Sequence, residues 1–327
     1  MRSTPHILVV NGTKVRRPVF ILGAPHSGAE RLARAVKRSP GFHLTTGRHG
    51  VLRVTYAFAR QPAIATERGK GAARVLRDAY AEAWLVSARS CAQCPGECRD
   101  LAGLPPRPSE RPGRPGGGPA DGPGGEAAEP CVEPGGIVRF ADASPDLIYS
   151  ADVLLDAFPD AQLVQVIRDG RDAVADMLAD ERCLAWFKPG LANLDTVFPN
   201  PFLGVEDHTE RSRWPRAAPA VKCALRWRGS VRLSARLRRQ VPDEQLFTVR
   251  YEDLVSGPRR VGADLSEYLD APISKAALSG LVRAAGEHGD AGVGSWRERL
   301  TPRQLAQVEK IAGTELRRLG YRLCTDL

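Results

Sequence analysis

Long hydrophobic runs are scarce in this sequence of 327 residues. The strongly apolar stretches, HILVV at 6–10 and VFILG at 19–23, are too short for a signal core or a membrane span, and polar residues such as Asn11 and Lys14 interrupt them. We therefore expect a cytoplasmic protein with no membrane partner. At 43% hydrophobic and 26% charged residues, the composition is that of a soluble chain long enough to bury a large core.

Aromatic residues are also few, at 6% of the chain, and arginine is scattered along the helical patterns without forming a tail. A nucleic-acid groove usually shows a denser basic stripe, so we expect no nucleic-acid partner. The net charge of +9 fits a small anionic ligand best.

Short β-type runs alternate with helical patterns along the whole chain. The expected strands lie at 19–22, 42–45, 137–141, 162–167 and 246–250, and the expected helices at 28–38, 73–89, 171–180, 217–240, 258–270 and 302–319. This alternation predicts an α/β fold with a doubly wound parallel sheet of about five strands flanked by helices, in one domain over 1–327. Thr301, Pro302 and Gln304 form a capping-box pattern at the start of the last helix.

The segment 103–136 is set apart by its composition, because more than half of its residues are Gly or Pro. Such a segment cannot bury enough surface to order itself. We interpret it as a flexible insertion inside the domain, since the strand expected at 137 is needed to complete the sheet.

A glycine loop follows the first long strand. Gly23 and Gly28 have the spacing of a P-loop, which presents backbone N–H groups and a helix N-terminus to an anion. Ala29 and Glu30 stand where the common nucleotide-binding loop has Lys and Ser or Thr, so the cation for a γ-phosphate and the Mg²⁺ ligand are missing. These departures argue against an ordinary ATPase or GTPase. A strand-to-helix turn that binds nothing stays an alternative for the loop alone.

Three further stretches carry the argument beyond the loop. FPDAQLVQVIRDGRDAVADML at 158–178 is a buried strand that ends in Arg168 and then turns into a helix, so that two guanidiniums lie at the carboxyl end of a strand. LFTVRYEDLVSGP at 246–258 is a strand followed by an acidic turn, and the last stretch is GVGSWRERLTPRQLAQVEKIAGTELRRLGY at 292–321. In this order, the four stretches resemble the sulfotransferases that use 3′-phosphoadenosine-5′-phosphosulfate (PAPS).

The resemblance implies a donor site and a reaction. The glycine loop would hold the 5′-phosphate of PAPS through Gly23, Pro25, His26, Ser27, Gly28, Ala29 and Glu30. His26 stands where the family usually has a Lys or Arg that stabilises the leaving oxygen, and it is the first candidate catalytic residue. The sulfuryl group would move in line to a hydroxyl or amine of a small-molecule acceptor, which needs alignment, positive dipoles and a base.

The other implied positions lie further along the chain. Arg168 would bind the 3′-phosphate with Arg171 in support, at a site where Asp176 replaces the usual Ser. Tyr251 would lie near the adenine, and Trp296 and Arg297 would close over the nucleotide. His49, in TTGRHG, is the candidate base because related bacterial enzymes often carry a Lys-Glu pair at the comparable place.

Two carboxylates depart from the family pattern in this region. A carboxylate about 5 Å from a phosphate would cost roughly 3 kcal/mol at an effective dielectric near 20. Asp176 and Glu30 therefore either turn away or pair with Arg31, Arg168 or Arg171, or the donor site is poor. The alternative function is a non-catalytic relative that binds a nucleotide or anion through a degenerate site.

The cysteines form a separate cluster in the sequence. Cys91, Cys94 and Cys98 precede the insertion, and Cys131 follows it. Disulfides are improbable in a cytosolic chain, so the alternatives are reduced thiols or a structural Zn²⁺ site that pins both ends of the insertion. Other cysteines are interpreted as core residues, namely Cys183, Cys223 and Cys324.

The basic helix expected at 222–240 repeats Leu and Val at helical spacing with Arg between them. The pattern predicts an amphipathic helix with a solvated cationic face. A role for Arg226 or Arg228 in holding the donor is the weaker alternative.

Overall fold

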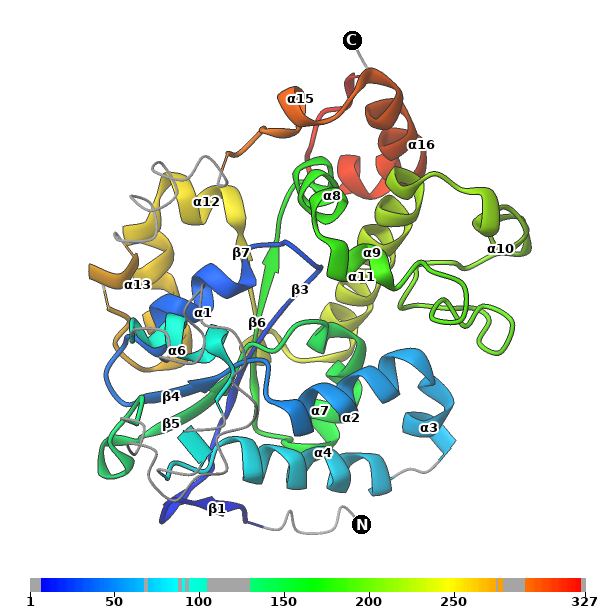
Figure 1. Ribbon diagram of the computed structural model, residues 1–327. Helices are drawn as coiled ribbons and strands as arrows, with labels where there is room; N and C mark the ends of the chain where they lie inside the picture. Colours follow the sequence, from blue (N-terminus) through cyan, green and yellow to red (C-terminus); the bar gives the residue numbers. More distant parts are fainter. Residues whose placement is uncertain are drawn as a thin grey trace, which may run out of the picture.

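The computed structural model describes residues 7–67, 70–87, 90–91, 94–104, 130–274, 276–278 and 292–324. Its centre is a sheet of five parallel strands in the order β4-β5-β3-β6-β7 (Figure 1), with β3 Val19–Gly23, β4 Phe42–Thr45, β5 Arg139–Asp142, β6 Gln162–Ile167 and β7 Leu246–Arg250. A two-stranded antiparallel hairpin, β1 Val9–Val10 and β2 Thr13–Lys14, precedes it. The predicted fold class is confirmed.

The central strand β3 is buried on both faces, which explains its unbroken run of apolar residues. Phe20 and Leu22 pack into the core on one side of the sheet, whereas Val19 and Ile21 pack into the core on the other. This period of two is the side-chain alternation of a strand. Gly23 ends β3 at its carboxyl edge and leads into the glycine loop.

Helices cover both faces of the sheet (Figure 1). One face carries α2 His49–Arg60, α4 Lys70–Ala83 and α7 Ala151–Ala157, and the other carries α1 Ala29–Lys37, α12 Tyr251–Ser256 and α13 Pro258–Leu269. A third core joins α8 Gly170–Ala179, α11 Pro219–Gln240 and α16 Pro302–Arg318. The shorter helices are α3 Pro62–Glu67, α6 Gly96–Ala102, α9 Glu181–Ala185, α10 His208–Arg213 and α15 Trp296–Arg299.

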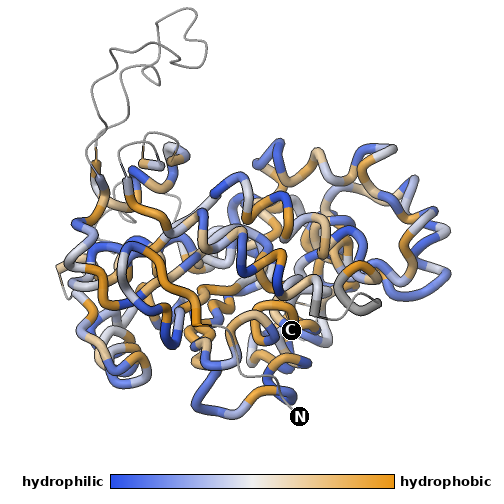
Figure 2. Tube along the Cα trace, turned by 90° about the horizontal axis from the view of Figure 1, so that it is seen from below, coloured by the Kyte–Doolittle hydropathy of each residue, from blue (hydrophilic) through white to orange (hydrophobic). Residues whose placement is uncertain are grey.

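Four short 3₁₀ segments complete the described elements: η2 Pro134–Gly136, η3 Leu147–Ser150, η4 Trp214–Arg216 and η5 Asp243–Gln245. Hydrophobic and hydrophilic residues alternate at short intervals along the tube in Figure 2. That pattern is typical of helices that bury one face each. Within the described ranges, no helix combines the length and the apolar character needed to cross a bilayer.

Several predicted boundaries are corrected by packing. The helix expected at 73–89 ends at Ala83, because Trp84 is buried and its indole N–H donates to the carbonyl of Ala141 at 3.0 Å. The acidic turn expected after β7 is the helix α12. The unpredicted helix α2 contains β-branched and aromatic residues of modest helix propensity, and its buried face stabilises it.

Both ends of the Gly/Pro-rich insertion expected at 103–136 belong to the folded structure. Gly103 caps α6 in a left-handed conformation with φ 77°, and η2 precedes β5. The N–H groups of Val138 and Arg139 both donate to the carbonyl of Gly41, at 2.8 and 2.9 Å, which ties this end to the sheet. The rest of the interpretation, over 105–129, lies outside the described residues.

The solvated cationic face expected on α11 is wrong at two positions. Arg226 and Arg228 are only 1% and 6% exposed, because α8 and α16 pack against this helix. Arg226 donates to both carboxylate oxygens of Asp146, at 2.9 and 2.8 Å, and Arg228 pairs with Glu210 at 2.7 Å. Both arginines are therefore structural ion-pair partners.

The three single cysteines divide between core and surface. Cys183 and Cys223 are buried as predicted, in the core around α8 and α11. Cys324 is exposed, so its prediction as a core residue is wrong. It lies beyond the end of α16, where its backbone N–H donates to Glu309 at 3.0 Å and its side chain gains no cover.

Candidate functional site

The glycine loop joins β3 to α1 in a tight turn. The N–H of Ser27 donates to the carbonyl of Ala24 at 3.0 Å, and α1 begins directly after Gly28. His26 has a φ of 58°, in the left-handed region that residues with a side chain rarely adopt. Strain of this kind is found at ligand sites more often than elsewhere in a fold.

Two glycines of the loop are required by close packing. A Cβ on Gly23 would lie 2.1 Å from the Ser27 hydroxyl, and a Cβ on Gly28 would lie 2.2 Å from the Tyr251 ring. The loop is therefore wedged between the sheet and the start of α12. Ser27 is 2% exposed, and its Oγ has no hydrogen-bond partner among the described residues.

Arg168 extends from the carboxyl end of β6 toward this loop. Its Nη1 donates to the carbonyl of His26 at 3.0 Å, and its guanidinium lies 4.6 Å from the centroid of the Tyr251 ring. Arg168 is 4% exposed, and within the described chain its Nε and Nη2 have no hydrogen-bond partner. The tips of β3 and β6 thus meet around a small cavity whose lining includes Ala24, Ser27, Arg168, Trp227, Ser230 and Ser234.

Asp176 pairs with Arg168, which is one of the outcomes expected from the sequence. Its Oδ2 accepts from Arg168 Nη1 at 2.6 Å, and its Oδ1 accepts from Arg299. Burial works against the charge of Arg168, but the neighbouring Asp176 outweighs it and raises the pKa of the guanidinium. The carboxylate therefore engages Nη1 of Arg168, and Nε and Nη2 are left without a partner among the described residues. Glu30 is exposed, and its charge acts on the nearby Tyr251.

His26 has a carboxylate partner that the sequence did not suggest. Its Nε2 lies 3.1 Å from Oδ2 of Asp180, which also caps α9 by accepting from the N–H of Arg182. Partial burial acts to raise the pKa of Asp180, but the Arg182 N–H and the nearby imidazole outweigh it and lower the pKa. The pair holds the imidazole at the mouth of the glycine loop.

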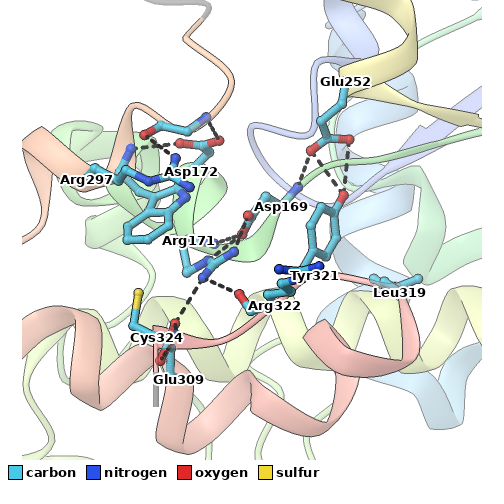
Figure 3. Close-up of polar contacts among 12 residues, drawn as sticks. Asp169, Arg171, Asp172, Glu252, Arg297, Glu309, Leu319, Tyr321, Arg322 and Cys324 are labelled. Atoms are coloured by element: carbon cyan, nitrogen blue, oxygen red, sulfur yellow. Dashed lines mark hydrogen bonds and ion pairs between the residues drawn. The ribbon is translucent and has the colours of Figure 1, made fainter. Parts of the chain in front are cut away.

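The residues after β6 tie the C-terminal segment to the sheet (Figure 3). Arg171 donates to Asp169, Glu309 and the carbonyl of Arg322. Asp172 accepts from the N–H groups of Gly294 and Trp296, both at 2.8 Å. Arg171 is therefore a hub of the fold, and we do not assign it to the donor.

The predicted closing residues lie in the segment that Asp172 anchors. Trp296 is 4% exposed, and two guanidiniums lie over its ring. The distance to the ring centroid is 4.2 Å from Arg171 and 4.4 Å from Arg297. Arg297 is exposed and donates to the carbonyl of Gly294 at 3.3 Å. Its neighbour Arg299 is the residue that reaches Asp176, and the sequence pattern did not single it out.

His49 begins α2 and is exposed. In the described ranges it has no hydrogen bond or ion pair with another side chain. Tyr251 is 1% exposed beneath Gly28 and Arg168, so its ring is covered by the loop. The structure thus brings together Ser27, Gly28, Arg168 and Tyr251.

The four cysteines do converge, but around a cation from the protein itself. Cys91, Cys94, Cys98 and Cys131 lie close enough for the thiols to influence one another's pKa. Lys37 Nζ lies 3.4 Å from Cys98 Sγ and 3.5 Å from Cys131 Sγ, and it donates to the carbonyl of Leu44 at 2.6 Å. No group of three or more His, Cys, Asp or Glu side chains in the described part of the chain is placed to hold a metal ion. The zinc hypothesis is therefore unsupported, and the buried ammonium supplies positive charge at this cluster.

The buried carboxylate of Asp142 leads to a testable prediction about stability and pH. Asp142 ends β5 and is fully buried, and burial raises its pKa to about 6 even though Thr45, Ser144 and Tyr80 donate to it. The folded state then binds a proton more readily than the unfolded state, so stability should fall as pH rises from about 4 to about 6, by at most about 3 kcal/mol. Denaturant unfolding of Asp142→Asn across this range should show a flatter profile.

The matched control for that experiment is Asp264→Asn, since Asp264 is exposed on α13. Its profile should follow that of the wild type. An Asp142→Asn profile with the same slope as the wild type would show that Asp142 titrates normally.

Comparison with known proteins gives similarity to solved structures alone. No family model and no curated protein matches the chain. The sulfotransferase domain of the Synechococcus PCC 7002 olefin synthase is 17% identical, with a TM-score of 0.47 over 94% of this chain and 95% of that chain. The sulfotransferase domain of the curacin biosynthetic pathway is 13% identical, with a TM-score of 0.46 over 95% of this chain and 100% of that chain. Sulfotransferase STF9 from Mycobacterium avium is 16% identical, with a TM-score of 0.43 over 95% of this chain and 79% of that chain. Identities and TM-scores at this level do not establish membership of a family.

Proposed function

We propose that this chain binds an adenosine phosphosulfate between the glycine loop and Arg168, and that it transfers the sulfuryl group to a hydroxyl or amine of a small-molecule acceptor. The sequence resemblance implies PAPS as the donor. The observation that carries the proposal is a set of buried donors without partners in the described chain, namely Arg168 Nε, Arg168 Nη2 and Ser27 Oγ. Buried donors are costly unless a ligand satisfies them, and an anion with several oxygens can do so.

The proposed reaction uses the loop as the anion cradle. The acceptor oxygen or nitrogen forms a bond to sulfur while the bond from sulfur to the 5′-phosphate oxygen breaks, and the nucleotide leaves with that oxygen and its charge. The backbone N–H groups before α1 face the leaving oxygen in this arrangement. His26, with Nε2 held by Asp180, has Nδ1 left to meet the same oxygen. The acceptor proton passes to a base, for which His49 stays our prediction.

A specific observation favours the second candidate, a non-catalytic relative that binds an anion or nucleotide. The Asp176 carboxylate lies between Arg168 and Arg299, where it takes the place of an external anion. In that case the glycine loop and Arg168 hold a ligand without transferring a group.

Calorimetry with two nucleotides, adenosine 3′,5′-bisphosphate and adenosine 5′-monophosphate (AMP), tests the proposed site. We expect micromolar binding of at least one of them, and Arg168→Gln should weaken it about thirtyfold, since a charge-assisted hydrogen bond to the ligand is lost. Arg239→Gln, an exposed arginine on α11, should bind like the wild type. The absence of heat with either nucleotide at millimolar concentration would overturn the proposal.

Turnover separates the two candidate functions. The wild type is mixed with a library of hydroxyl- and amine-bearing metabolites and with a phosphosulfate donor that carries radiolabelled sulfur. Transfer of label to any acceptor supports the enzyme. The assay is run with two labelled donors, PAPS and the analogue that lacks the 3′-phosphate. If nucleotide binds but neither donor transfers its label, the result supports the non-catalytic relative.

A further inference from the structure

The Asp176 carboxylate is held in a fixed position within the proposed nucleotide site. It lies on α8, which begins two residues after Arg168, and its side chain is 16% exposed. Oδ2 accepts from Arg168 at 2.6 Å, and Oδ1 accepts from Arg299, which also donates to the carbonyl of Ala175 at 3.2 Å. Each oxygen of an ionised carboxylate can accept two hydrogen bonds, so both keep capacity for a further donor.

The helix that carries Asp176 is held at its start. Asp169 caps α8 by accepting from the N–H of Arg171 at 2.9 Å, and Asp172 is fixed by the N–H groups of the 294–296 turn. A short side chain on an anchored helix cannot move far from its partners. The carboxylate therefore stays within reach of whatever binds at Arg168.

The charges around Arg168 are balanced before any ligand binds. Arg168 and Arg299 supply two cations, Asp176 supplies a contacting carboxylate, and Asp172 is a second carboxylate whose field acts on Arg168. A phosphate dianion bound at Arg168 would gain no net positive charge from these four side chains, and it would be repelled by Asp176. A hydroxyl group would instead donate to Asp176 and accept from the open Nε or Nη2 of Arg168.

A carboxylate at such a position discriminates between hydroxyl and phosphate. In dinucleotide-binding folds, an Asp or Glu bonds the ribose hydroxyl of NAD, whereas an Arg accommodates the phosphate of NADP. We propose that Asp176 selects a nucleotide with an unphosphorylated ribose, so that the donor is of the adenosine 5′-phosphosulfate class. This inference rests on the proposed function, since it concerns the same site. The sulfur-to-oxygen bond to the 5′-phosphate then breaks to release AMP, as the acceptor forms its bond to sulfur and loses its proton to the base.

Calorimetry on Asp176→Ser tests the selectivity, with AMP and adenosine 3′,5′-bisphosphate as the probes. The wild type should bind AMP at least about tenfold more tightly than the bisphosphate. In Asp176→Ser, the bisphosphate affinity should rise about a hundredfold and the preference should reverse. Asp264→Ser, which removes an exposed aspartate from α13, should keep the wild-type ratio. Asp176→Asn keeps the shape of the side chain and serves if the Ser variant fails to fold.

The outcomes distinguish this inference from the function on which it rests. A wild type that prefers the bisphosphate, or an Asp176 variant that leaves the ratio unchanged, overturns the selectivity while the nucleotide site stands. Failure of both nucleotides to bind the wild type overturns the proposed function and the selectivity together.

Discussion

Replacement of Arg226 by methionine is expected to lower the free energy of unfolding by about 3 to 5 kcal/mol, because it leaves the Asp146 carboxylate buried without its partner. Asp146 is 8% exposed and accepts two hydrogen bonds from the guanidinium, which also lies 4.3 Å from the centroid of the Phe202 ring. Asp146→Asn should be comparably destabilising for the reverse reason, since it strands a buried cation. Denaturant unfolding of both variants measures the effect.

The double variant Arg226→Met, Asp146→Asn removes both charges and should recover part of the loss. Arg260→Met is the control, because Arg260 is 69% exposed and lies 3.6 Å from Asp253, and removal of an exposed ion pair should cost less than about 1 kcal/mol. Equal effects at Arg226 and Arg260 would contradict the view that burial makes the first pair costly to break.

Gly28→Ala should lower the free energy of unfolding by about 4 kcal/mol and weaken nucleotide binding. Gly28 has a φ of 87°, and this left-handed conformation costs an alanine about 1 kcal/mol or more. The added Cβ would also lie 2.2 Å from Tyr251, and overpacking of that kind costs about 1 to 3 kcal/mol, or more. Because Arg168 stacks on the same ring, a displaced Tyr251 shifts the guanidinium as well. Denaturant unfolding and calorimetry measure the two effects.

The control Gly190→Ala separates the cost of backbone strain at positive φ from the cost of a steric clash with a neighbouring side chain. Gly190 has almost the same φ, 84°, but no heavy atom lies within 4 Å of its added Cβ. We expect the free energy of unfolding to fall by only about 1 kcal/mol and nucleotide binding to stay unchanged. If the two substitutions cost the same, the contact between the loop and Tyr251 is not what requires Gly28.

The sheet was predictable because its strands are short and β-prone, and because β3 and β6 are almost wholly buried. The expected strand at 162–167 coincides with β6, and that at 246–250 with β7. Helix α2 was not predicted because its stability comes from packing against α4 and η3, and no local sequence pattern indicates that contact. The same holds for α12, whose acidic start was interpreted as a turn.

The candidate site was predictable where it depends on one strand end and its loop. The glycine loop and Arg168 lie at neighbouring strand tips, as parallel strands require. The partners of these residues were hidden, because Asp180 is 154 residues from His26 and Arg299 is 123 residues from Asp176. For the cysteines, the sequence predicted their convergence, but the contribution of Lys37 arises from α1 and could not be read from their spacing.

The fastening of the 294–296 turn to Asp172 has a consequence for biosynthesis. The glycine loop, Arg168 and Asp176 all precede Arg299 and the α16 helix in the sequence. A nascent chain therefore carries Arg168 and Asp176 without the second cation that holds the carboxylate in place. The charge balance that we assign to this cavity is therefore complete only when the 294–296 turn docks on Asp172, so ligand recognition requires that step of folding.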